Sequence, residues 1–116
     1  MSVAAVAVVL VTALMNGAVA VGDLLRAPFV LATSEQVRVP ETWLPALGAA
    51  KMAGAVGLVV GLLGVRVIGV AAAAGLVLFF VCAIARHVQT GVLRTIPFPG
   101  AFLVLASMSL LVFVRG

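Results

Sequence analysis

Four long apolar stretches fill most of this 116-residue chain and constrain its fold more than any other feature. An α-helix rises about 1.5 Å per residue, so about 20 apolar residues cross the hydrocarbon core of a bilayer. The stretches lack the alternation of polar and apolar residues that is typical of membrane strands. They cover residues 3–22, 46–65, 67–85 and 97–114. The sequence therefore predicts an all-α integral membrane four-helix bundle that forms a single domain over residues 1–116.

Composition excludes most other classes of protein. Only 9% of the residues are charged, whereas soluble domains carry about 25%. The seven Lys and Arg residues outnumber the three Asp and Glu residues. They are scattered along the chain, so they indicate anchoring at a membrane surface and not binding to nucleic acid. Because Cys82 is the single cysteine, an intrachain disulfide, a CxxC redox pair and a cysteine-rich metal or iron–sulfur centre are excluded, and no metal site is expected.

The connections between the apolar stretches differ in length. A tight turn at residues 64–66 predicts that the second and third helices form an antiparallel hairpin. The connection between the first two helices spans residues 23–45, which is long for so small a domain. Trp43 near its end is typical of an interfacial anchor, and we expect a short amphipathic or re-entrant segment on the membrane surface. Ala18-Val19-Ala20 resembles a signal-peptide cleavage site, but no Lys or Arg precedes the first apolar stretch, which favours a retained membrane helix.

Small residues recur along one face of the second predicted helix. Four of them follow one another at intervals of four residues: Ala49, Ala53, Gly57 and Gly61. Small residues let membrane helices approach closely, because hydrophobicity alone does not hold helices together in lipid. We favour packing within the bundle for this row. The alternative is an interface with a second copy of the chain or with another membrane protein.

Polar side chains gather on one side of the membrane. With four spans, the long first connection and the connection of residues 87–96 lie on the same side. Six residues reach this side as a candidate polar site for a quinone or a lipid headgroup: Asn16, Asp23, Arg26, Lys51, Arg86 and His87. Lys51 inside a span indicates either a functional group or a side chain that extends back to the headgroups. His87 is typical either of a helix C-terminus or of a hydrogen-bond donor to a quinone carbonyl.

The residues that begin the second helix are similar to a known family. The stretch Val39–Leu58, VPETWLPALGAAKMAGAVGL, resembles the corresponding part of DoxX-like small membrane proteins, particularly the actinobacterial ones. Further similarities are the end of the third helix at Ala85-Arg86-His87 and the proline-rich start of the fourth. The resemblance covers nearly the whole chain. It implies a four-helix membrane fold and an association with quinone-linked oxidoreductases, and it marks Lys51 and His87 as the positions to test.

Three functions remain open at this point, and the sequence does not decide whether the chain is an enzyme. We favour an accessory or structural subunit of a membrane complex, since the chain shows no complete catalytic constellation and no cofactor motif. The alternative is a quinone-interacting subunit of an oxidoreductase, with quinone as the one candidate cofactor. A small multidrug-type transporter is the third reading, although the first span has no acid before Asp23 and the chain has no tyrosine.

The distribution of arginines predicts an orientation. The side of the long connection carries four arginines and the other side carries two: Arg26, Arg38, Arg86 and Arg94 against Arg66 and Arg115. Positively charged connections favour the cytoplasmic side. We therefore expect a multi-pass protein of the inner (plasma) membrane with its long connection in the cytoplasm. Its expected partners are the lipid bilayer and another membrane protein or a second copy of the chain.

Overall fold

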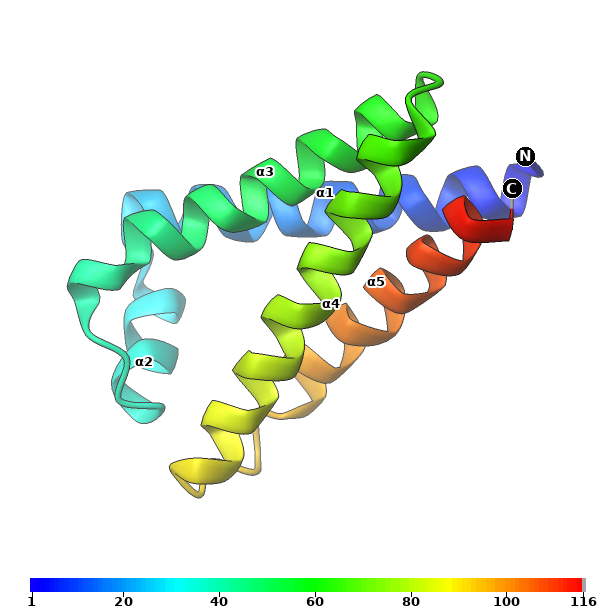
Figure 1. Ribbon diagram of the computed structural model, residues 1–116. Coiled ribbons are helices and arrows are strands. Elements are labelled where there is room, and N and C mark those ends of the chain that lie inside the picture. Colours follow the sequence, from blue (N-terminus) through cyan, green and yellow to red (C-terminus); the bar gives the residue numbers. More distant parts are fainter. Residues whose placement is uncertain (116) are drawn as a thin grey trace.

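The computed structural model describes residues 1–115, and this part of the chain is helical without strands. The elements, in chain order, are α1 (Val3–Leu25), α2 (Pro28–Gln36), the 3-10 helix η1 (Glu41–Trp43), α3 (Leu44–Leu62), α4 (Arg66–Gln89) and α5 (Pro97–Arg115) (Figure 1). Four segments are long and apolar enough to cross a membrane: α1, η1 with α3, α4, and α5. The predicted all-α fold with four spans is confirmed.

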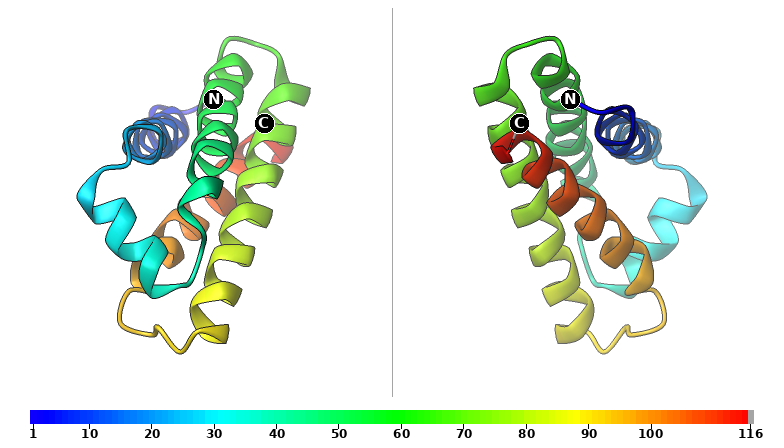
Figure 2. Two further views of the ribbon diagram at one scale, coloured as in Figure 1. Left: turned by 90° about the vertical axis from the view of Figure 1, so that its left-hand side faces the viewer. Right: turned by 90° about the vertical axis from the view of Figure 1, so that its right-hand side faces the viewer.

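The spans form two antiparallel pairs. Helix α1 packs along α3, and α4 packs along α5 (Figure 1). The pairs meet near the two chain termini and the α3–α4 turn, and they diverge toward the other end (Figures 1 and 2). Helix α2 lies at the diverging end, between the end of α1 and the end of α4. Both termini therefore lie at the same end of the molecule, as four spans require.

The predicted ends of three spans need correction. Helix α1 continues from the predicted end at residue 22 to Leu25, and it stops where Arg26 adopts a left-handed conformation with φ 52°. Helix α4 continues from the predicted end at residue 85 to Gln89, so Arg86 and His87 are helical. Helix α3 covers Leu44–Leu62 and not residues 46–65. Apolar stretches mark the residues that suit lipid, whereas a helix ends where capping and turn residues stop it.

The α3–α4 turn shows this difference most clearly. The apolar pattern continues through Leu63 and Val65, but Gly64 has a φ of 118°, which other residues rarely adopt. This conformation reverses the chain between α3 and α4. The hairpin that the sequence predicts therefore forms, with a turn that begins earlier than expected.

The long connection between the first two spans contains α2. Pro28 occupies the first turn of this helix, where its missing N–H costs little. Within α2, the buried side chains are Val30 and Ser34, and Phe29 is more than half exposed. The hydroxyl of Ser34 donates to the carbonyl of Val30 at 2.8 Å, which satisfies it inside its own helix. The short segment expected at the membrane surface is thus a nine-residue helix.

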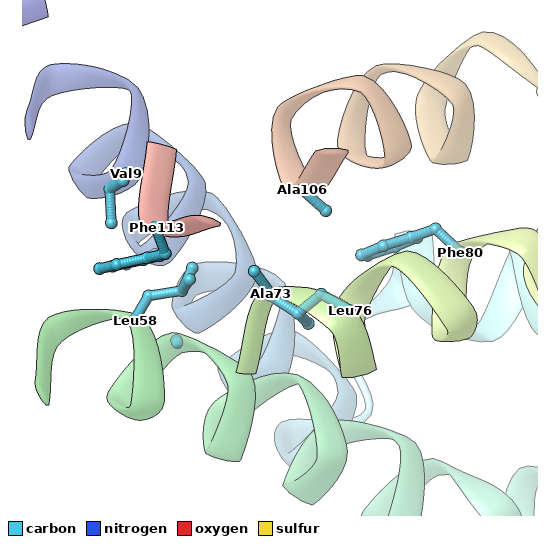
Figure 3. Packing of buried hydrophobic residues seen from close by; sticks show 9 residues of the cluster. Val9, Leu58, Ala73, Leu76, Phe80, Ala106 and Phe113 are labelled. Atoms are coloured by element: carbon cyan, nitrogen blue, oxygen red, sulfur yellow. The ribbon is translucent and has the colours of Figure 1, made fainter. Parts of the chain in front are cut away.

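The hydrophobic core lies where the two helix pairs meet. All four spans contribute to it, and Figure 3 labels these members: Val9, Leu58, Ala73, Leu76, Phe80, Ala106 and Phe113. The backbones of α3 and α4 approach closely beside this cluster. A Cβ atom added to Gly61 would lie 2.6 Å from Gly69 Cα and 2.8 Å from the Phe113 ring. Glycine on both helices therefore makes room for the Phe113 side chain.

Candidate functional site

A close contact between α1 and α3 creates the most polar site inside a span. Gly48 of α3 lies against α1, where an added Cβ atom would be 3.0 Å from Asp23 Cβ and 3.1 Å from the carbonyl oxygen of Ala20. The absence of a side chain at Gly48 thus sets the spacing of the two helices. Lys51, three residues further along α3, lies on the same face and is opposite Asp23.

Asp23 and Lys51 form a buried ion pair. Lys51 Nζ donates to Asp23 Oδ2 at 2.8 Å, and the two side chains are 12% and 3% exposed for Lys51 and Asp23 respectively. Opposite charges satisfy each other here in a place where either charge alone would be costly. Lys51 therefore turns toward α1 and pairs with Asp23.

Aromatic rings border the ion pair on the side of α4. Lys51 Nζ lies over the Phe79 ring, 5.3 Å from its centroid, which is within the range of a cation–π interaction. Phe79 contacts Phe80 edge to face at 5.1 Å, and Phe80 contacts Phe102 of α5 at 5.2 Å. The ammonium group is thus held between a carboxylate of α1 and a ring of α4.

Asn16 belongs to a separate polar cluster at the middle of α1. Its Nδ2 donates to the carbonyl of Thr12 at 2.9 Å, and Ser109 Oγ of α5 donates to Thr12 Oγ1 at 3.0 Å. All three residues are fully buried. Asn16 Oδ1 accepts no hydrogen bond from the described residues. Asn16 and Asp23 both lie on α1, but Asn16 bonds within α1 whereas Asp23 pairs with Lys51 of α3.

Arg86 and His87 occupy neighbouring positions on α4 with different roles. Arg86 donates from Nε to the carbonyl of Val37 at 2.8 Å and from Nη2 to the carbonyl of Arg38 at 2.9 Å. His87 is buried, with Nδ1 2.8 Å from the carbonyl oxygen of Ala83. This contact favours a proton on Nδ1. Nε2 meets no hydrogen-bond partner among residues 1–115.

The six predicted site residues therefore do not form one site. Asp23 and Lys51 contact each other. Arg26 pairs with Glu41 at 3.3 Å on the surface, where both side chains are about half exposed. Such surface pairs contribute about 0–1 kcal/mol. Asn16, Arg86 and His87 each have their own surroundings, as described above.

The row of small residues on α3 divides into two halves. Gly57 and Gly61 face α4, where added Cβ atoms would lie 2.6 Å from Ala72 Cβ and 2.6 Å from Gly69 Cα respectively. Ala49 and Ala53 are exposed. The C-terminal half of the row thus packs within the chain, as favoured from the sequence. The N-terminal half remains on the outer surface.

An open groove follows the outer face of α3 and α4. It has a volume of about 260 Å³, and its walls include Ala50, Ala53, Gly54, Ala71, Gly75 and Phe79. Gly75 has open space above it, since an added Cβ atom would meet nothing within 4 Å. Phe79 lines the groove, and Lys51 Nζ lies over its ring.

Three residues that make contacts between helices were not predicted from the sequence: Phe79, Ser109 and Arg66. Arg66 at the start of α4 donates to the carbonyls of Phe113 and Val114, near the end of α5. A serine inside the fourth span was a signal for Ser109, because a hydroxyl in a span seeks a partner. Phe79 and Arg66 carried no such signal, since rings and terminal arginines are common in membrane helices.

The donor atoms present limit the chemistry. Within residues 1–115, no three His, Cys, Asp or Glu side chains lie together as a group that could hold a metal ion. Cys82 is an exposed thiol on α4. The residues near the groove offer an ammonium group, a carboxylate and aromatic rings, which suit hydrogen bonding and stacking with a polar headgroup.

Fold and site together define the class: a small multi-pass membrane protein of two helix pairs, with a short helix α2 in the connection between the first two spans. The model of the DoxX-like family matches residues 5–109, so the chain belongs to the DoxX-like family. This confirms the resemblance seen in the sequence. Searches of curated proteins and of solved structures gave no significant match.

Proposed function

We propose that this chain is an accessory subunit of a complex in the inner (plasma) membrane and that it binds one transmembrane helix of a partner protein in the α3–α4 groove. The single observation that carries this proposal is the exposed small-residue surface of the groove. Ala50 and Ala53 of α3 face Ala71 and Gly75 of α4 across it. A transmembrane helix can approach such a surface closely, which is how membrane helices associate without a hydrophobic driving force.

Gly75 supports this proposal in particular. Glycine inside a helix is about 1 kcal/mol less favourable than alanine. Glycine at residues 57, 61 and 69 is explained by close contacts within the chain. Gly75 has no such contact, because an added Cβ atom would meet nothing within 4 Å. Close approach of a partner helix accounts for a residue that the chain's own packing does not require.

The experiment places a photo-crosslinking amino acid at Gly75 or Ala53 and, as a control, at Ala18 on the exposed side of α1. Irradiation of the native membrane is followed by mass spectrometry of the products. We expect one partner membrane protein at both groove positions and none at Ala18. Equal products at all three positions would contradict docking in the groove. A product of twice the chain's mass would instead identify a second copy as the occupant.

A second candidate function is quinone binding, which one specific observation favours. Phe79 lines the groove, and Lys51 Nζ lies 5.3 Å from the centroid of that ring. An isoprenoid tail suits the apolar groove, and Lys51 has further N–H groups to donate to a quinone carbonyl. In this role the chain would belong to an oxidoreductase, and electrons would come from another protein.

The two candidates are distinguished by what remains bound after purification in mild detergent. Quinone binding predicts a quinone in the organic extract that is lost from Gly75→Leu, which fills the groove, and retained in Ala18→Leu. If the unchanged protein contains no quinone and the crosslinking experiment identifies a partner, the accessory role is supported and quinone binding is excluded. A quinone that is retained equally by both variants would count against binding in the groove.

A further inference from the structure

Helix α2 contacts both helix pairs: its start contacts α1, and its end contacts α4. At its start, Phe29 and Val30 cover Gly22 of α1, where an added Cβ atom would lie 3.0 Å from a Phe29 ring carbon and 3.4 Å from a Val30 methyl group. At its other end, the two bonds from Arg86 of α4 hold the carbonyls of Val37 and Arg38. Figure 2 shows α2 across the diverging end of the molecule.

The attachment by Arg86 has the geometry of a latch. The last carbonyls of a helix lack donors within that helix, and a planar guanidinium group can bind two oxygens at once. Arg38 has a φ of 56°, the left-handed conformation that often ends a helix, and the N–H of Val39 donates to the carbonyl of Ser34 at 2.8 Å within this end. The two bonds from Arg86 join this helix end to α4.

Apart from these attachments, few contacts hold α2 in place. Helices of nine residues are marginal by themselves. Only Val30, Ser34 and the capping residue Val37 are buried along this segment. Segments with few buried apolar contacts open at low free energy.

Buried polar groups lie next in sequence to both attachment points. Asp23 follows Gly22 and is paired with Lys51. His87 follows Arg86, is 5% exposed, and has no hydrogen-bond partner for Nε2 within the described chain. Unpartnered buried polar atoms are rare and costly, so they indicate a place where water or a ligand binds.

We propose that α2 is a strap across the diverging end of the two helix pairs and that Arg86 is its latch. When the latch opens, α2 moves away from Gly22 and the end of α4. Water and polar headgroups then reach the Asp23–Lys51 pair and His87. The proposal rests on these contacts alone and is independent of both candidate functions above.

The test measures how fast a thiol on α2 reacts with a membrane-impermeant maleimide in lipid nanodiscs. The natural thiol is removed first with Cys82→Ser. The reporter is Ser34→Cys, which replaces a buried hydroxyl with a group of similar size, and the reference is Thr33→Cys on the exposed side of the same helix. Both cysteine variants are measured with Arg86 unchanged and with Arg86→Gln. The control is Arg94→Gln, which removes an exposed arginine elsewhere in the chain.

We expect Ser34→Cys to react slowly in the presence of Arg86 and at least about tenfold faster with Arg86→Gln, because local opening exposes it. The rate should not change with Arg94→Gln, and Thr33→Cys should react fast throughout. An unchanged rate for Ser34→Cys with Arg86→Gln would overturn the latch. A fast rate in the presence of Arg86 would overturn the closed strap.

A third reporter separates local opening from unfolding. Ser109→Cys lies in the fully buried centre of the bundle. It should stay unreactive in the Arg86→Gln background. Reaction at this position would show that the whole bundle loosens, which would overturn a strap that opens by itself. Arg86→Lys should give an intermediate rate at Ser34→Cys, since an ammonium group keeps the charge but not the paired donors.

Discussion

The contact between Lys51 and Asp23 shows how one residue can depend entirely on another inside a membrane. Each side chain is almost fully shielded, and the 2.8 Å contact gives each its counter-charge. A buried pair of this kind adds little stability compared with two apolar residues, but the loss of one member is costly. The pair therefore makes α1 and α3 dependent on each other at this depth.

Removal of one charge should reveal this dependence. We expect Lys51→Met to lower the free energy of unfolding by about 3–5 kcal/mol, because Asp23 is left buried and unpaired. The double variant Lys51→Met with Asp23→Leu should recover most of that loss. The measurement is reversible unfolding in a mixed detergent series, followed by circular dichroism.

Arg26 provides the control for this experiment. Its pair with Glu41 is about half exposed, so Arg26→Met should cost at most about 1 kcal/mol. A loss for Lys51→Met as small as that for Arg26→Met would show that the pair is hydrated. A double variant that is no better than the single one would show that Lys51 acts through other contacts.

At the scale of the helices, close packing depends on which glycines face a neighbour. Gly61 and Gly69 bring α3 and α4 together beneath the Phe113 ring. Gly75 is on the same helix as Gly69 but has open space above it. The same substitution at these positions therefore tests packing and helix propensity separately.

Gly61→Ala should destabilise the bundle by about 1–3 kcal/mol, because the new methyl group overlaps the Gly69 backbone, which cannot move aside cheaply. Gly75→Ala should be neutral or stabilising by up to about 1 kcal/mol, since alanine favours a helix. Unfolding of the purified chain in detergent measures both. Equal effects of the two substitutions would mean that α3 and α4 are further apart than the structure indicates.

Arginines at helix ends also join elements that are distant in the sequence. Arg66 of α4 binds carbonyls in the last turn of α5, and Arg86 of α4 binds the carbonyls of Val37 and Arg38, directly after α2. Each end of α4 thus binds the backbone at the C-terminal end of another helix. This use of arginine is favourable because cations also interact well with the negative end of the helix dipole.

At the scale of the whole molecule, the arginines predict how the chain lies in the membrane. The α2 end carries four arginines, against two at the end of the termini. We expect the α2 end in the cytoplasm and both termini on the opposite side. The test introduces a thiol at Ser2 or at Thr33 in the Cys82→Ser background and treats intact cells with a membrane-impermeant maleimide. We expect labelling at Ser2→Cys, on the outer side, and none at Thr33→Cys, on the cytoplasmic side. Labelling at Thr33→Cys but not at Ser2→Cys would reverse the assignment.

The overall fold was predictable because long apolar stretches alone determine four spans and their count places the termini together. The candidate site was less predictable. The position of Lys51 inside a span was predictable from the sequence. Its contact with Asp23 was not predictable, because that contact depends on how closely Gly48 lets α1 approach. Asn16 and Asp23 share one face of α1, yet Asn16 bonds within α1 and lies beside the Thr12–Ser109 contact. Contacts between distant helices are set by packing, which a periodic pattern does not contain.

The divergence of the two helix pairs has a consequence for the surrounding lipid. Pairs that separate toward one end cannot both stand parallel to the membrane normal, so the spans must tilt. Helices α1 and α4, with 23 and 24 residues, are about 35 Å long at 1.5 Å per residue, and tilting fits such lengths into a core of about 30 Å. We therefore expect the protein to displace more lipid area from the leaflet at the α2 end than from the opposite leaflet. The free energy of inserting the protein should then depend on the thickness and curvature of the membrane.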